Sequence, residues 1–202
     1  YVQDDMNNVV IYKPATPGYE NAPTVILQGH MDMVCAKCPE IEHDFIKDGL
    51  KLVVKDGFLS AEGTTLGGDD GIAVAYGLAL LDSTDSPHPA LEVVFTVDEE
   101  TGLLGADGFD CSLLKGRRMI NLDSEKEGCL WVSCAGGVAG NSYLPVRRVD
   151  ASGRKVNVKV CGLVGGHSGA EIHKNRASAN ILMGQFLYEL SHVCGYALKE
   201  LE

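Results

Sequence analysis

The stretch TVILQGHMDMVC, residues 24–35, contains both the clearest fold signal and the first candidate for chemistry. Its first half is a continuous apolar run, which is typical of a strand buried on both faces of an α/β sheet. Its second half carries His30 and Asp32, two positions apart. Because side chains alternate along a strand, both point the same way at its end. The presence of an imidazole and a carboxylate on the same side at the end of a buried strand suggests a chemical role for the pair.

Strand and helix patterns alternate on both sides of this run. The segment 71–81 carries small and aliphatic residues all round, which predicts a helix buried on more than one face. The pattern as a whole predicts an α/β fold with a mixed or largely parallel sheet flanked by helices. The other expected elements are strands at 9–13, 24–29, 90–97 and 118–123, a hairpin over 51–61 around Asp56-Gly57, and a short helix near 101–108.

The character of the sequence changes after Glu127. Segments 129–146 and 154–163 have strand-like patterns, and a helical pattern runs from about 177 to 190. We therefore expect two domains, 1–127 and 128–202, with the second one incomplete. The first residue is Tyr1 rather than methionine, which predicts that the chain is part of a longer protein.

Composition narrows the class of protein. The 202 residues carry 28 acidic and 17 basic side chains, a net charge of −11, which argues against nucleic acid or an anionic membrane as the main partner. The chain has neither a signal peptide pattern nor a run of about 20 apolar residues, so we expect a cytoplasmic protein. Seven scattered cysteines predict reduced thiols.

Four clusters of acidic residues or histidine follow expected strands or turns. Each alone is more typical of a turn or a helix cap. Together at one sheet edge they predict a site for two metal ions, because imidazole and carboxylate are zinc ligands. Asp32 would then accept the second N–H of His30 and fix its orientation. The clusters are His30/Asp32, Asp69/Asp70, Asp98/Glu99/Glu100 and Asp123/Glu125.

Six motifs in this order resemble the aminoacyl-histidine dipeptidases (Xaa-His dipeptidases, or peptidase D), within the two-zinc exopeptidases and aminoacylases. They are GHMDMV, GTTLGGDDG, DEETG, LDSE, SCAGG and GGHSGAEIH. The resemblance covers nearly all of the chain. It implies a zinc-exopeptidase-like sheet in a catalytic domain, 1–127, and part of an α+β lid and dimerisation domain, 128–202.

The resemblance also implies the metal ligands. His30 and Asp123 would bind the first ion, Asp69 would bridge the two ions, and Glu100 would bind the second. Two divalent ions are implied, with zinc expected and cobalt or manganese as alternatives. In the family the second ion takes a histidine from nearer the C-terminus, and neither His173 nor His192 matches that motif.

The same resemblance implies three catalytic roles. Asp32 would orient His30, Glu99 would be the general base, and His167 of the lid would stabilise the oxyanion, often in the site of a partner subunit. Asp70 is interpreted as a turn residue and Asp98 as structural.

The expected reaction is hydrolysis of dipeptides, either of Xaa-His or carnosine-like type or of broad specificity. Removal of the acyl group from N-acyl amino acids is the nearest alternative, and a non-catalytic dimerisation module is another. A homodimer through the lid is possible. Because one ligand of the second ion is missing, we expect the 202 residues alone to bind one zinc tightly and to be inactive.

Two further motifs are interpreted as incidental. Cys35-x-x-Cys38 resembles half of a zinc knuckle, but no second pair follows it. The glycines of GLVGGHSG, residues 162–169, lack both the GxGxxG spacing and the lysine of a phosphate-binding loop.

Overall fold

The apolar run forms β3, Val25–His30, in the interior of a five-stranded sheet. The computed structural model describes residues 1–124, 126–134, 136–138, 140–166 and 171–201. It consists of two compact units, Tyr1–Cys129 and Leu130–Glu202. The sheet belongs to the first unit. The assignment of a catalytic and a lid domain to residues 1–127 and 128–202 stays a prediction.

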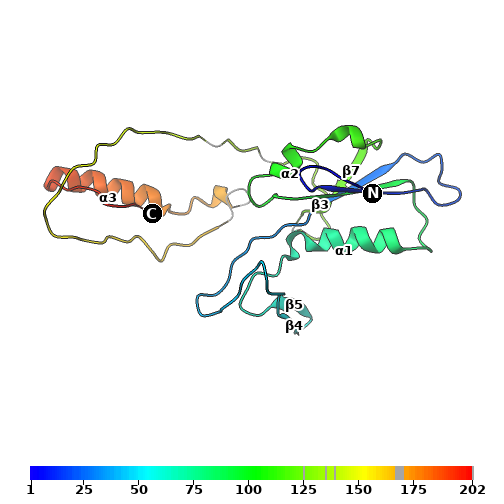
Figure 1. The fold of residues 1–202 in the computed structure, drawn as a ribbon, viewed down its shortest axis with the longest axis horizontal. Helices are drawn as coiled ribbons and strands as arrows, with labels where there is room; N and C mark the ends of the chain where they lie inside the picture. Colours follow the sequence, from blue (N-terminus) through cyan, green and yellow to red (C-terminus); the bar gives the residue numbers. More distant parts are fainter. Residues whose placement is uncertain (125, 135, 139, 167–170, 202) are drawn as a thin grey trace. The chain divides into compact units, whose positions relative to one another are not determined.

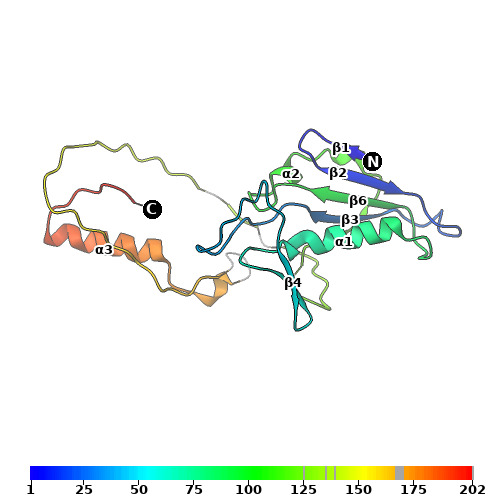
Figure 2. The ribbon, with the colours of Figure 1, turned by 60° about the horizontal axis from the view of Figure 1, so that its bottom comes forward.

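The sheet is mixed, and Figure 2 shows β2, β6 and β3 side by side. Strand β3 is parallel to both of its neighbours, β6 (Leu91–Thr96) and β7 (Arg118–Asn121). On the other side of β6, β2 (Val9–Lys13) and then β1 (Val2–Gln3) are antiparallel. The order is β1-β2-β6-β3-β7, which confirms the predicted α/β class and mixed sheet.

Both faces of the sheet are covered, and Figure 1 shows α1 and α2 on opposite sides of it. Every residue of β6 is buried, including the polar residues Glu92 and Thr96, and burial on both faces explains why the rest of the strand is apolar. On the α1 face, Leu27, Val93 and Phe95 form the core with Val74, Leu80 and other side chains. On the opposite face, the core consists of Val10, Ile26 and Val94 with Phe109, Leu113 and Leu114.

Helix α1, Gly68–Asp82, packs on the sheet through small residues. Ala73 and Gly77 are buried, and a Cβ on Gly77 would lie only 2.7 Å from the ring of Phe95. At the far end, Lys13 of β2 donates hydrogen bonds to the carbonyls of Leu80, Leu81 and Ser83. A cation there complements the helix C-terminus, where α1 itself has no basic residue.

The expectation that this helix is buried on more than one face was wrong. The side chains of Ile72, Tyr76 and Leu78 are each more than half exposed. The face that packs on the sheet contains Ala73, Val74 and Gly77, and the main contacts of α1 with another described element are with β3. The apolar residues on every side of α1 therefore did not mean that every side of the helix is buried.

The predicted hairpin is present as β4, Leu52–Lys55, and β5, Phe58–Ala61, paired antiparallel. Asp56 and Gly57 have φ values of 53° and 82°. Both central residues are thus left-handed, as a tight hairpin turn requires, and Asp-Gly is a preferred pair for it.

The connection from β6 to β7 contains α2, Leu104–Asp107, and the short helix η1, Cys111–Leu113. The Asp110 side chain accepts the N–H of Ser112 at the start of η1. Glu92, buried in β6, accepts the N–H groups of Lys115 and Gly116 just before β7. These contacts fix the path by which β7 returns to the sheet.

The second unit contains η2, Ile172–Lys174, and α3, Ala179–Val193, close to the predicted helix. Ser178 begins α3, because its side chain accepts the N–H of Ile181. The strands expected at 129–146 and 154–163 were wrong, since the described residues of both segments contain no strand. A strand needs a hydrogen-bonded neighbour, and alternating side chains alone do not supply one.

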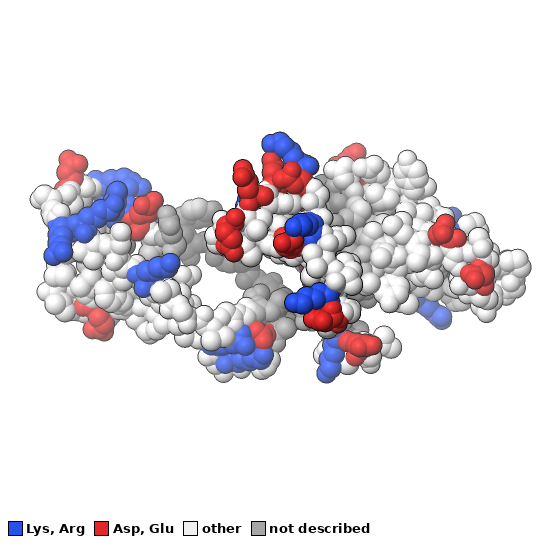
Figure 3. Space-filling model, turned by 90° about the horizontal axis from the view of Figure 1, so that it is seen from below, with Lys and Arg blue, Asp and Glu red and all other residues white. Residues whose placement is uncertain are grey.

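Two surface features complete the description. Lys and Arg side chains are interspersed with Asp and Glu side chains on the face drawn in Figure 3. In the part of the chain that the structure describes, no helix is long and apolar enough to cross a membrane.

Candidate metal centre

His30 is the last residue of β3, and its ring is held at both nitrogens. The residue is 1% exposed. Its Nδ1 lies 2.9 Å from the main-chain carbonyl of Asp32, and its Nε2 lies 3.1 Å from Oδ1 of Asp69. With Nδ1 donating to the carbonyl, Nε2 is the nitrogen that is left to bind a metal ion.

The contact of Asp32 with His30 differs from the prediction. The main-chain carbonyl of Asp32 accepts the hydrogen bond from Nδ1, whereas the nearest carboxylate oxygen of Asp32 is 3.4 Å from Nδ1. The carboxylate instead accepts the N–H groups of Glu99 at 3.1 Å and Glu100 at 3.0 Å. Asp32 therefore joins the histidine to the loop that carries both glutamates.

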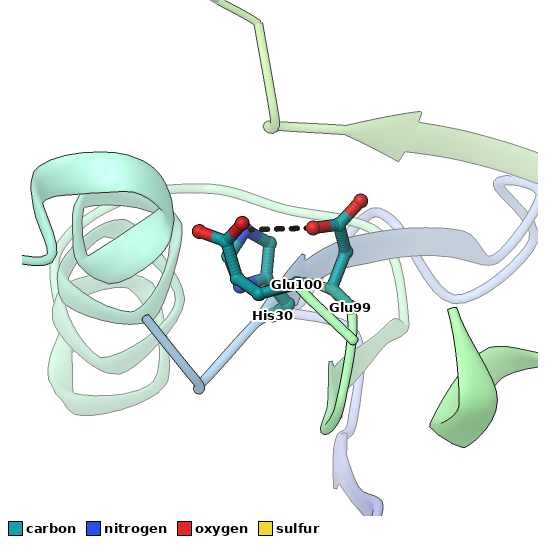
Figure 4. Close-up of side chains that lie close together, drawn as sticks. All are labelled: His30, Glu99 and Glu100. Carbon is teal, nitrogen blue, oxygen red and sulfur yellow. Dashed lines mark ion pairs between the residues drawn. The ribbon is translucent and has the colours of Figure 1, made fainter. Parts of the chain in front are cut away.

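Two groups of possible ligands share His30. One contains His30, Asp69 and Asp123, and the other contains His30, Glu99 and Glu100. In each group, one donor atom from every residue lies within 4.8 Å of the others. Figure 4 shows the side chains of Glu99 and Glu100 next to the imidazole of His30, and Oε2 of Glu99 lies 4.0 Å from Nε2. Both glutamates are thus near enough to the histidine to share a metal site with it.

The fold explains how distant segments meet at this point. Strands β3, β6 and β7 are parallel, so the residues that follow their carboxyl ends lie at one edge of the sheet. His30, Glu99 and Asp123 come from these three ends. Asp69 arrives differently, because it follows no strand and lies in the first turn of α1. Asp69 and Glu100 also line one surface pocket.

Asp70, which the sequence analysis interprets as a turn residue, is instead a buried residue in the first turn of α1. It is 1% exposed, and its carboxylate accepts the N–H of His30 and the N–H of Ala73, both at 3.3 Å. It therefore joins the start of α1 to the end of β3. The sequence reasoning missed this role because Asp-Gly is typical of turns, and the only contrary signal was the apolar helix pattern that follows.

The ionisable groups influence one another strongly. Burial lowers the pKa of His30, but its contacts with Asp69 and Asp32 outweigh burial and raise the pKa above the usual value. Burial, together with the charges of Asp123, Glu100 and Asp32, raises the pKa of Glu99. Burial also raises the pKa of Asp70. In Asp32 the bonds from the two N–H groups outweigh burial and lower the pKa.

This donor set fits a divalent metal ion. One imidazole nitrogen faces several carboxylates that are close enough to repel one another, and a cation between them would offset that repulsion. Histidine and carboxylate are ligands that suit zinc. The geometry supports metal binding without fixing the number of ions.

Comparisons with known proteins find dipeptidases among the relatives of this chain. The chain is 42% identical to the cytosol non-specific dipeptidase of Escherichia coli (strain K12) over 187 residues, which are 92% of this chain and 39% of that protein. In structure it matches the aminoacylhistidine dipeptidase of Vibrio alginolyticus with a TM-score of 0.63 and 37% identity, over 92% of this chain and 38% of that one. The chain is a relative of the aminoacyl-histidine dipeptidases. This confirms the resemblance inferred from the motifs.

Two further comparisons complete the picture. The uncharacterized protein YqjE of Bacillus subtilis (strain 168) is 32% identical over 112 residues, which are 54% of this chain and 28% of that protein. No family model matches the chain. The chain spans less than two fifths of the length of the dipeptidase in Escherichia coli and of the one in Vibrio alginolyticus.

Other histidine and acidic residues named in the sequence analysis do not belong to these groups or lie outside the described residues. His167 and Glu125 are among the residues that the structure does not describe. Asp98 begins the loop after β6, and its carbonyl accepts the N–H of Leu104, which fits the predicted structural role. His173 and His192 are in the second unit, within η2 and α3, and both are exposed.

The cysteines of the Cys35-x-x-Cys38 motif are free and exposed. Neither belongs to a group of possible metal ligands among the described residues.

Proposed function

We propose that the protein is a metal-dependent dipeptidase that hydrolyses the peptide bond of short peptides. The observation that carries this proposal is the pair of ligand groups that share the buried His30 at the carboxyl edge of the parallel strands. The dipeptidases to which the chain is similar support the reaction class.

In this proposal two divalent ions, most simply zinc, are held at the edge of the sheet. His30 and Asp123 would hold the first ion, Glu100 would hold the second, and Asp69 would be a ligand shared by both. When bound, the ions make the attacking water more acidic and polarise the carbonyl of the scissile bond.

The chain's own residues have distinct tasks. Asp32 keeps the His30 ring in place through its carbonyl and holds the loop of Glu99 and Glu100 through its carboxylate. Glu99 takes a proton from the attacking water and delivers it to the departing amine. His167, which the structure does not describe, is assigned to the oxyanion by the motif alone.

The finer aspects of function rest on the relatives. We propose that substrates are Xaa-His or carnosine-like dipeptides, or dipeptides of broad sequence, that the protein acts in the cytoplasm, and that it forms a homodimer through residues 128–202. The names of the relatives, a cytosol non-specific and an aminoacylhistidine dipeptidase, support the first two proposals. Turnover of N-acetyl amino acids in place of dipeptides would instead indicate a deacylase.

The test compares two neighbouring glutamates in the protein encoded by the complete reading frame. Glu99→Gln should leave bound zinc near the wild-type amount while turnover of a dipeptide such as Ala-His falls by about 100-fold or more, the scale for loss of a general base. Glu100→Gln should instead weaken zinc binding.

Each variant is the matched control for the other, because the same substitution is made at adjacent positions. If Glu99→Gln loses zinc and Glu100→Gln retains it fully, then Glu99 is the metal ligand and Glu100 is the general base. A wild-type protein that binds no divalent metal and cleaves no dipeptide would refute the proposal.

A further inference from the structure

Asn8, which matches no motif in the sequence analysis, is one of the least exposed polar residues that the structure describes. It lies directly before β2 and is 1% exposed. Its side chain makes three hydrogen bonds. The amide nitrogen donates to Oδ2 of Asp4 at 2.8 Å and to the carbonyl of Gly105 at 2.9 Å, and the amide oxygen accepts the N–H of Val97 at 3.1 Å.

These bonds require asparagine rather than a residue of similar shape. Two partners are acceptors and one is a donor, so the group must offer two N–H donors and one acceptor. An aspartate would place its oxygens against the oxygens of Asp4 and Gly105. A buried carbonyl that loses its only side-chain donor is costly.

Asn8 joins the two ends of the loop that carries the glutamates. Val97 directly precedes Asp98-Glu99-Glu100, and Gly105 follows that loop in α2. The two ends are also bonded to each other, because the N–H of Gly105 donates to the carbonyl of Val97 at 3.1 Å. A Cβ on Gly105 would lie 2.1 Å from that carbonyl oxygen and 2.7 Å from Oδ1 of Asn8. The loop is therefore closed tightly at its base.

The loop is also held at the glutamates themselves. Asp32 accepts the N–H groups of Glu99 and Glu100, and Asp4 holds Asn8 by accepting its main-chain N–H at 2.8 Å as well as its side chain. The loop is thus held at its base by Asn8 and at its tip by Asp32. A base that shifts would move both glutamates relative to His30.

We propose that Asn8 is a positioning residue that sets the placement of Glu99 and Glu100 at the metal centre by closing the base of their loop. Its importance for hydrolysis rests on the proposed function, whereas the placement of the loop can be tested without it.

The experiment compares Asn8→Asp with Asn7→Asp in the protein encoded by the complete reading frame. The two substitutions are the same, at consecutive positions, but Asn7 is exposed and its side chain bonds only Gln3 among the bonds identified. Asn7 has a φ of 74°, a conformation that aspartate tolerates. Circular dichroism establishes that each variant is folded.

Two readouts are measured on the folded variants. In Asn8→Asp, hydrogen exchange at the N–H groups of Glu99 and Glu100 should become about 10-fold faster or more, while the N–H groups between β3 and β6 stay protected. The kcat for a dipeptide should fall by about 10- to 100-fold with little change in KM, because a small misplacement affects the chemical step most. Asn7→Asp should leave both readouts at wild-type values.

The outcomes separate this inference from the proposed function. Unchanged exchange at Glu99 and Glu100, or unchanged kcat in an active enzyme, would overturn it, since a residue that only stabilises the fold would lower the unfolding temperature and alter neither. If the wild type cleaves no peptide, the proposed function fails and the exchange measurement alone decides. If Asn8→Asp does not fold, Asn8→Ser replaces it with the same expectations.

Discussion

Replacing Gly29 with alanine would disturb the fold and the metal centre through one methyl group. Gly29 is buried in β3, next to His30, where α1 crosses the strand. A Cβ on this residue would lie 2.3 Å from Cβ of Ala73 and 2.5 Å from Oδ2 of Asp70. Ordinary contact begins at 3.4 Å, so the start of α1 would have to move by about 1 Å.

The magnitude follows from how rigid the neighbours are. The Cβ of Ala73 is fixed to the helix backbone, and Asp70 is held by the N–H groups of His30 and Ala73, so no side-chain rotation relieves the contacts. Overpacking of this kind costs about 1–3 kcal/mol, whereas alanine gains only about 0.4–1 kcal/mol through the unfolded chain. The difference between the central values is a net loss of about 1 kcal/mol, or roughly 2–4 °C in Tm.

The assay is urea and thermal unfolding of a double-mutant cycle with Ala73→Gly. Removing the Ala73 methyl group should restore part of the space, so the double variant should be more stable than the sum of the single effects predicts, by about 1 kcal/mol. Gly49→Ala is the control, because its Cβ would meet no atom within 4 Å. The displaced helix carries Asp69, so kcat should also fall, by about 10-fold.

A coupling energy near zero would refute the reasoning, because it would mean that the strand and the helix do not approach closely at this point. A Gly29→Ala variant with the stability and the kcat of the wild type would refute it as well.

Three other outcomes test separate contacts. Lys13→Met removes the cation at the C-terminus of α1 and should lower the free energy of unfolding by about 1–2 kcal/mol, against less than about 1 kcal/mol for Lys47→Met at an exposed ion pair, as urea unfolding would measure. Asp123→Asn should weaken the first zinc site by about 10-fold or more in a zinc titration, and unchanged affinity would remove it from the ligand set. Asp32→Asn offers one acceptor where two N–H groups donate, so the turnover of a dipeptide should fall by about 10-fold at unchanged KM.

The sheet could be predicted from the sequence because its signals are local. The mainly apolar segments Val25–His30 and Leu91–Thr96 have the pattern of strands covered on both faces. The Asp56-Gly57 pair predicts the hairpin turn, because both residues readily adopt the positive φ that the turn requires. The strands predicted for the second unit were wrong, because an alternating pattern shows that one side of a segment is apolar but does not show that a neighbouring strand is present to pair with it. The predicted burial of α1 was wrong, because composition alone cannot distinguish the small residues that pack on the sheet from the larger apolar residues that remain exposed.

The metal centre was predictable only in its ionisable residues. His30, Asp69 and Asp123 carry chemistry that the sequence displays, and parallel strand ends explain why His30 and Asp123 meet. Asp70 and Asn8 act through hydrogen bonds across the fold. Asp70 bonds His30, 40 residues away, and the longest contact of Asn8 is to Gly105, 97 residues away. Nothing in the local sequence around an asparagine or an Asp-Gly pair indicates such partners.

The strand order also has a consequence for how the chain reaches its native state. Strands β2 and β3 are consecutive in the sequence, yet β6 lies between them and hydrogen bonds to both. The two early strands therefore cannot complete their pairing until a strand more than 60 residues after β3 has been synthesised and inserted. Sheets built from such distant pairs fold slowly, and during translation the unpaired N–H and C=O groups along β2 and β3 are open to pairing with other chains. Arrival of β6 closes both edges in one event and brings Glu99 and Glu100 to His30 at the same time.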